Sequence, residues 1–143
     1  MPSLRDFFKG RELYFVTPQV SVSEAARYMS ERNVGAVCVL EKDRLVGIVS
    51  ERDMMKRVIA ANRDPRATLV ADVMTLEVLC CTPETGLEEV RGVMKHRRIR
   101  HLPVVDGARC LQGLVSIGDL NAHEATSQEQ TIHLLHEYLY GRV

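Results

Sequence analysis

The sequence predicts a mixed α/β (α+β) fold in which two copies of one β-α-β-β-α unit pack together, followed by a C-terminal helix. Three observations lead to this prediction. The chain repeats itself at a fixed spacing, which is the signature of a duplicated unit. Each copy holds short apolar runs bounded by polar turns, as strands do. Each copy also holds a segment with apolar residues at helical spacing.

The repeat is visible when the chain is compared with itself. Thr17-Pro18 recurs 65 residues later as Thr82-Pro83. Other residues coincide under the same shift: Glu24 with Glu89, Met29 with Met94, Arg32 with Arg97, and Val39 with Val104. One extra residue then enters a turn, so that GIVSERD (47–53) matches GLVSIGD (113–119) at a shift of 66. Because insertions collect in turns while the flanking elements keep their register, the two copies indicate a duplicated fold.

Each copy begins with a β-rich segment and a helix. The β segments are expected at Glu12–Val16 and Glu77–Cys81, and each ends at a Thr-Pro pair. In copy one Ser23 is the expected N-cap of the helix. The expected apolar stripes are Val22, Ala25, Ala26 and Met29 in copy one, and Leu87, Val90 and Met94 in copy two.

Two short strands joined by a polar turn follow each helix. They are predicted at Ala36–Leu40 and Leu45–Val49 in copy one, and at His101–Val105 and Cys110–Val115 in copy two. A second helix closes the unit. In copy one its apolar face is predicted from Met54, Met55, Val58 and Ile59, and in copy two it is short.

The domain boundaries follow from these elements. Asn62–Val70 is polar with a central proline, so it is typical of a linker. We expect repeat 1 at residues 5–62, the linker at 63–71, repeat 2 at 72–123, and a C-terminal helix at 124–143. In that helix Ile132, Leu135 and Leu139 recur at helical spacing, so one face should dock on another surface.

Composition and charge argue against several classes of protein. The 19 basic and 19 acidic side chains balance, whereas a nucleic-acid-binding protein needs a basic surplus. No apolar run reaches the ~18 residues of a membrane span, and the first residues are charged where a signal peptide is apolar. We therefore expect a cytoplasmic protein without membrane contact. Its four cysteines show no CxxC spacing, so we expect reduced thiols and no metal site.

The repeated motif Gly-h-h-Ser-x-x-Asp, in which h is apolar, carries the clearest functional signal. It stands where a strand ends and a helix begins, at Ser50 with Asp53 and at Ser116 with Asp119. A serine three residues before an acid resembles a capping box, so a purely structural role is one interpretation. The other is ligand binding: a helix N-terminus attracts anions, and a carboxylate there can accept both hydroxyls of a ribose.

A basic run, KHRRIRH (95–101), precedes the buried strand of copy two. Such a run is often only a solvated face. Arginine also matches phosphate geometry through paired N–H groups, so Arg98, Arg100 and Arg52 are candidate phosphate ligands. Copy one has Ala36 and Cys38 where copy two has His101 and Pro103, so two sites in this chain would be chemically unequal.

As a set, GIVSERD, GLVSIGD, DVMT (72–75) and RRIRHLPVVD (97–106) resemble the cystathionine-β-synthase (CBS) domain family. The resemblance covers roughly residues 5–125, as a tandem pair or Bateman module, and by its length the chain is similar to the stand-alone members. It implies two clefts that hold an adenosyl ligand: AMP first, then ATP, NAD(H) or S-adenosylmethionine. It also implies a homodimer and a regulated protein target that the sequence does not disclose.

Carried over by position, the resemblance assigns ribose binding to the Ser50–Asp53 and Ser116–Asp119 pairs. It places backbone near Val16, Ala36, Val78 and His101 beside the adenine. The full set of candidate ligand-binding residues is Val16, Ala36, Ser50, Arg52, Asp53, Thr75, Val78, Arg98, Arg100, His101, Pro103, Ser116 and Asp119. We rank the site at Asp119 above that at Asp53, because its repeat also carries Arg98, Arg100 and His101.

Other functions remain open on the sequence. No GxGxxG, GxxxxGK[ST], HExxH or GxSxG motif occurs, so an enzyme is not expected. The alternative to nucleotide sensing is a structural module that dimerises or docks a partner and has no physiological ligand. Nucleic-acid binding comes third, because it rests only on the basic run.

Overall fold

The structure is a computed structural model that describes residues 3–8 and 11–124. The first repeat contains β1 (Phe15–Val16), α2 (Val22–Arg32), β2 (Ala36–Glu41), β3 (Arg44–Ser50), α3 (Glu51–Met54) and the π-helix η1 (Met55–Ile59). The second contains α5 (Leu87–Arg97), β4 (His101–Val105), β5 (Leu111–Ser116) and α6 (Ile117–Glu124). Two short helices, α1 (Leu4–Phe7) and α4 (Val70–Val73), precede the repeats. The C-terminal helix predicted beyond residue 124 lies outside the described residues.

Each repeat forms its own small sheet. In repeat 1, β1 pairs in parallel with β2, and β2 pairs antiparallel with β3. In repeat 2, β4 and β5 pair antiparallel, and each of these strands lies within one residue of its prediction. The strand predicted at Glu77–Cys81 is wrong, because only a single parallel bridge, between Cys81 and Val104, remains of it.

Pro103 explains the lost strand. In repeat 1, the parallel pairing of Phe15 with Cys38 uses the N–H of Cys38. The counterpart of Cys38 is Pro103, which has no N–H to donate, so the ladder cannot extend past Cys81. Cys81 N still donates to Pro103 O at 3.0 Å, and Val105 N to Cys81 O at 2.9 Å.

Helices α2 and α5 occupy the same eleven positions of their repeats, 65 residues apart. The predicted cap of α2 is displaced: Ser21, not Ser23, is the N-cap, because Ser21 is extended and its Oγ accepts from Glu24 N at 3.1 Å. Val22, Ala25 and Met29 are buried as predicted, whereas Ala26 is exposed. The buried stripe is therefore narrower than the spacing suggested.

The second helix of repeat 1 also buries fewer side chains than predicted. Met54 and Val58 are buried, but Met55 is 52% exposed and Ile59 is 70% exposed. The helix changes at Met55 from α to the wider π turn. Only one row of side chains, spaced four residues apart, faces the core, so the adjacent row of Met55 and Ile59 is left on the surface.

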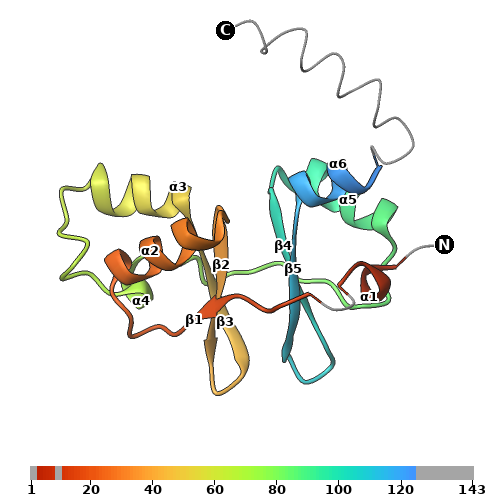
Figure 1. Ribbon diagram of the computed structural model, residues 1–143, viewed down its shortest axis with the longest axis horizontal. Coiled ribbons are helices and arrows are strands. Elements are labelled where there is room, and N and C mark those ends of the chain that lie inside the picture. The colour runs from red at the N-terminus through yellow and green to blue at the C-terminus, as the bar shows by residue number, and fades with distance from the viewer. Residues whose placement is uncertain (1–2, 9–10, 125–143) are drawn as a thin grey trace, which may run out of the picture.

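The two repeats share a central core. Each has its own apolar cluster between sheet and helices, with Met29 in one and Met94 in the other. A third cluster joins the sheets through buried side chains of both repeats, Cys38, Leu40, Leu45, Val105 and Leu111. Figure 1 shows the two sheets side by side at the centre, with the longer helices at the outer sides.

Each of the two short helices packs on the repeat that it does not precede. α1 packs on repeat 2, where Leu4 is fully buried and Leu4 N donates to Thr85 O at 3.2 Å. α4 spans the end of the expected linker (63–71) and the start of the expected repeat 2, and it packs on repeat 1, where Val70 N donates to Val20 O at 2.9 Å. These two contacts correspond under the repeat, so each half holds the leading segment of the other (Figure 1).

Candidate functional site

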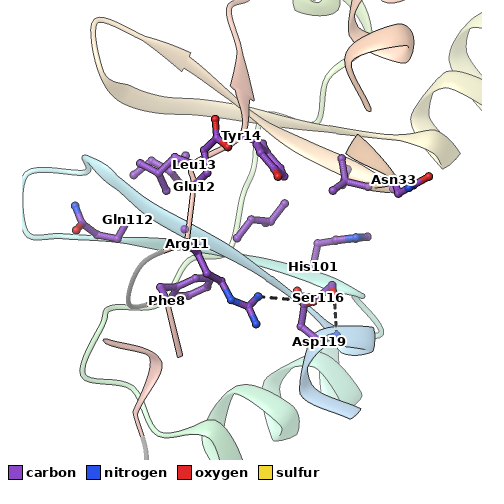
Figure 2. A pocket seen from close by; sticks show the side chains of 16 residues that line it. Phe8, Arg11, Glu12, Leu13, Tyr14, Asn33, His101, Gln112, Ser116 and Asp119 are labelled. Carbon is purple, nitrogen blue, oxygen red and sulfur yellow. Dashed lines mark hydrogen bonds and ion pairs between the residues drawn. The ribbon is translucent and has the colours of Figure 1, made fainter. Parts of the chain in front are cut away.

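A pocket of about 350 Å³ lies between the repeats. Repeat 1 and the chain before it supply Phe8, residues 11–14 and the 33–36 turn between α2 and β2. Repeat 2 supplies His101, residues 111–114 of β5, and the Ser116–Asp119 motif at the start of α6. Figure 2 shows His101, Ser116 and Asp119 on one side of the pocket and Tyr14 and Asn33 on the other.

The Ser116–Asp119 motif caps α6. Ser116 N donates to Asp119 Oδ2 at 3.2 Å, and Asp119 N donates to Ser116 Oγ at 3.0 Å. Within the part of the chain that the structure describes, no hydrogen bond reaches the other oxygen, Oδ1, which lies 3.9 Å from Arg11 Nη1. The side chain of Asp119 is 39% exposed and faces the pocket (Figure 2). Apart from this ion pair with Arg11, the cap leaves Oδ1 available to a ligand.

The Ser50–Asp53 motif makes the same cap on α3 but has more partners. Asp53 Oδ2 accepts from Ser50 N at 2.9 Å and from Ser50 Oγ at 3.1 Å. The second oxygen, Oδ1, accepts from Thr75 Oγ1 at 3.2 Å and lies 3.8 Å from Arg57 Nη1. Only 12% of the Asp53 side chain is exposed. Both carboxylate oxygens of this motif are thus engaged by the chain itself.

His101 stands at the start of β4, at the rim of the pocket. Burial is the main cause that lowers its pKa, and the neighbouring Arg100 lowers it further. The carboxylates of Asp119 and Glu51 act in the opposite direction. His101 is therefore mostly neutral near pH 7, and an anion beside it would draw a proton onto the ring.

Two glycines allow other segments of the chain to approach the strands closely. A Cβ at Gly113 would lie 2.7 Å from Cδ1 of Phe8, so only glycine allows Phe8 to close that wall of the pocket. A Cβ at Gly47 would lie 2.7 Å from Sδ of Met74. Met74 precedes Thr75, so the close approach at Gly47 brings the Thr75 hydroxyl to Asp53.

The structure distributes the sequence candidates over several places. Four of them line the pocket: Ala36, His101, Ser116 and Asp119. Three more, Ser50, Asp53 and Thr75, form the separate hydrogen-bonded group around the α3 cap. Val16 and Pro103 are buried in the two repeats, and Val78 packs against the central cluster. The remaining candidates, Arg52, Arg98 and Arg100, are exposed and do not line this pocket.

Sequence reasoning missed the segment before β1. Phe8, Arg11, Glu12 and Tyr14 line the pocket because α1 crosses to repeat 2 and carries the following residues past β5. The signal was present in the repeat itself. DVMT (72–75) corresponds, at the shift of 66, to residues 6–9 before copy one, and Phe8 of that stretch lines the pocket.

The described residues contain neither a helix long and apolar enough to cross a membrane nor a group of three metal-binding side chains. The four cysteines are free thiols. Burial raises the pKa of Cys38 and of Cys81 to about 12, so both thiols stay protonated at neutral pH.

Comparison with known proteins relates both repeats to one family. The family model described as CBS domain matches residues 5–60 and 70–140, one segment for each repeat. The chain is 34% identical over 130 residues to the CBS domain-containing protein CBSX3, mitochondrial, of Arabidopsis thaliana. That alignment covers 87% of this chain and 63% of the plant protein.

Solved structures agree with the fold. A protein with CBS domains from Burkholderia ambifaria superposes with a TM-score of 0.82 at 36% identity, covering 89% of this chain and 96% of that one. CBSX2, solved in complex with AMP, superposes with a TM-score of 0.76 at 26% identity, covering 90% of this chain and 99% of that one.

Proposed function

The chain belongs to the CBS-domain family, and we propose that it is a regulatory, non-catalytic module that binds an adenine nucleotide in the pocket between its repeats. The observation that carries this proposal is the Ser116–Asp119 cap, which leaves one carboxylate oxygen directed at a pocket between the two halves. The AMP complex of the related CBSX2 supports the choice of ligand class.

Different lining residues would contact the ribose, the adenine and the phosphate of a nucleotide. Asp119 Oδ1 would accept the ribose hydroxyls, as a carboxylate does in dinucleotide-binding folds. The side chains of Tyr14, Val34 and Leu114 would pack against the adenine ring. His101 and Arg11 would meet the phosphate, because they are the basic side chains among the lining residues.

The charges of the pocket favour a monophosphate. Because His101 is mostly neutral, Arg11 alone faces two acidic lining residues, Glu12 and Asp119, so the lining has no surplus positive charge. Additional phosphates would each need a further cation. We therefore rank AMP first, followed by ATP, NAD(H) and S-adenosylmethionine.

The test compares two matched variants by calorimetric titration with AMP. Asp119→Asn removes the charged acceptor but keeps a residue that fits the helix cap, so we expect AMP affinity to fall about tenfold or more. Asp53→Asn makes the same chemical change at the engaged carboxylate, so we expect a much smaller effect on affinity.

The outcomes separate the alternatives. A thermal-shift panel of AMP, ADP, ATP, NAD⁺, NADH and S-adenosylmethionine identifies any ligand that binds the folded state. Failure of every member to raise the melting temperature would favour the alternative, a dimerisation or docking module without a physiological ligand. Equal losses in both variants would mean that the two clefts bind alike.

We also propose a homodimer, because apolar side chains remain exposed on the second helix of repeat 1 and after α4. Ile59, Met55 and Leu76 are all more than half exposed, and the net charge of zero offers little repulsion between copies. Light scattering should give about twice the 16.1 kDa of one chain. A monomer at high micromolar concentration would refute the assembly without affecting nucleotide binding.

A further inference from the structure

A second cavity, of about 760 Å³, lies outside the nucleotide pocket, between α5 and the extended segment 79–82. We propose that this groove, formed by α5 and residues 79–82, binds a tyrosine side chain presented by an acidic segment of a partner protein. The proposal rests on how the same place is filled in repeat 1 and on the charges at the end of α5.

In repeat 1 the corresponding space is occupied by the chain's own aromatic rings. Tyr28 of α2 lies across to β1, where its hydroxyl accepts from Phe15 N at 3.3 Å. The ring of Tyr14 meets that of Tyr28 edge to face, with centroids 6.4 Å apart. The guanidinium of Arg32 lies 3.6 Å from the centroid of the Tyr28 ring and 5.6 Å from that of Tyr14.

Repeat 2 keeps the arginine and loses the rings. Since α2 and α5 coincide at a shift of 65 residues, Tyr28 corresponds to Val93, Tyr14 to Leu79 and Arg32 to Arg97. Val93, Leu79 and Arg97 all line the groove. Valine and leucine leave empty the volume that two phenol rings fill in repeat 1, and this difference accounts for the cavity.

Gly92 widens the opening. Its counterpart in α2 is Arg27, whereas a Cβ at Gly92 would meet no atom within 4 Å. The groove therefore has an apolar floor, from Val90, Val93 and Leu102, and free space at the helix surface. A phenol ring placed as Tyr28 is in repeat 1 would present its hydroxyl to Cys80 N, the counterpart of Phe15 N.

The charge at the end of α5 indicates the character of the partner. His96 and Arg97 line the groove, and the exposed Lys95 precedes them in the last turn of the helix. Glu89 is the acidic residue on the opposite end of the lining. These residues belong to the basic run KHRRIRH (95–101), of which only His101 lines the nucleotide pocket. Acidic residues beside the docked ring would meet it favourably.

The first experiment uses p-cresol, the side-chain analogue of tyrosine, and the full-length chain. Titration followed by amide NMR should shift the signals of Cys80, Gly92 and Val93. In Val93→Tyr the chain's own ring should fill the groove as Tyr28 does in repeat 1, so these shifts should disappear. The reciprocal variant Tyr28→Val should open the repeat 1 groove, so that shifts appear at Phe15.

The second experiment uses the peptide acetyl-Glu-Asp-Tyr-Glu-amide, with acetyl-Gln-Asn-Tyr-Gln-amide as the uncharged control. We expect the acidic peptide to bind more tightly, and Arg97→Gln to reduce its affinity about two- to fivefold. The control should lose less affinity, because it loses only the contact of the guanidinium with the tyrosine ring. The nucleotide site is untouched by these variants, so AMP affinity in Val93→Tyr and Arg97→Gln serves as the internal control of folding.

Three results would overturn the proposal. One is the absence of groove shifts with p-cresol and both peptides in a folded chain. Another is peptide binding that Val93→Tyr leaves unchanged. The third is a set of groove shifts that follow protein concentration and vanish in Val93→Tyr together with the dimer, because this would make a second copy of the chain the occupant.

Discussion

At the scale of single residues, the same helix cap is used in two different ways. Ser50–Asp53 and Ser116–Asp119 both satisfy free N–H groups at the start of a helix, as capping boxes do. Each carboxylate has an arginine partner, Arg57 for the first and Arg11 for the second, but only the first also accepts a hydrogen bond from Thr75, and the second faces a pocket. Capping and ligand binding are therefore compatible, since a carboxylate has a second oxygen to offer.

We expect His101 to make the stability of the folded chain depend on pH. Burial holds its pKa below the ordinary value of about 6.5, so the unfolded chain binds a proton on this residue more readily than the folded one. The stability contributed by neutral His101 is fully present above about pH 6.5 and is lost as the pH falls toward the folded-state pKa.

Thermal unfolding of the unliganded chain and of His101→Gln, measured at steps from pH 7.5 to pH 5.0, isolates this effect. The natural chain should lose more stability on acidification than the variant, because the variant has no imidazole to protonate. Arg100, Asp119 and Glu51, whose charges act on the ring, are present in both proteins, so their own titration contributes to both curves. Parallel curves for the two proteins would contradict the assignment.

At the scale of elements, the two long helices show how closely the repeats agree and where they differ. α2 and α5 end in the same way, with Asn33 and Arg98 in the left-handed conformation at φ 54° and 56°. Their N-terminal caps differ, because Ser21 of α2 corresponds to Gly86 of α5, which has no side chain to accept a hydrogen bond.

Ser21 should therefore matter and Ser23 should not. Ser21→Ala removes the acceptor for Glu24 N, and we expect a loss of about 0.5–2 kcal/mol in the free energy of unfolding. Ser23→Ala lies in the first turn of the same helix and should change stability by less than about 0.5 kcal/mol. Urea denaturation measures both, and the opposite order would restore Ser23 as the cap.

At the scale of the whole molecule, the exchange of α1 and α4 links the two halves. Leu4, far ahead of repeat 2 in sequence, is fully buried in the core of that repeat, and Arg5 pairs with Glu84. Val70 is buried in the core of repeat 1 in the corresponding way. Together with the central cluster, these contacts should make the described chain unfold as one cooperative unit.

Leu4→Ala tests this coupling, and Val70→Ala is its counterpart. Each truncation leaves a cavity, and for Leu4→Ala we expect a loss of about 2–5 kcal/mol. Amide hydrogen exchange should then show equal loss of protection in the β2–β3 and β4–β5 pairs, although Leu4 is buried in the core of repeat 2. Loss confined to β4–β5 would mean that the repeats open independently.

The sequence by itself determined the duplication, the four strands of the two hairpins, the long helices and the repeated cap. These features depend on local periodicity and on residues close in the chain, so one sequence contains the whole signal. The Ser116–Asp119 motif and His101 were found in the same way, because each lies at the boundary of a predicted element.

Only the tertiary structure decided how the two copies of the motif differ. The Thr75 hydroxyl reaches Asp53 across 22 residues, and the Phe8–Tyr14 segment lines the pocket only because α1 packs on the far repeat. Pro103 lies within β4, but its effect falls on the neighbouring segment, whose pairing is reduced to the single bridge at Cys81. Such contacts join residues that are distant in sequence, and no local pattern carries them.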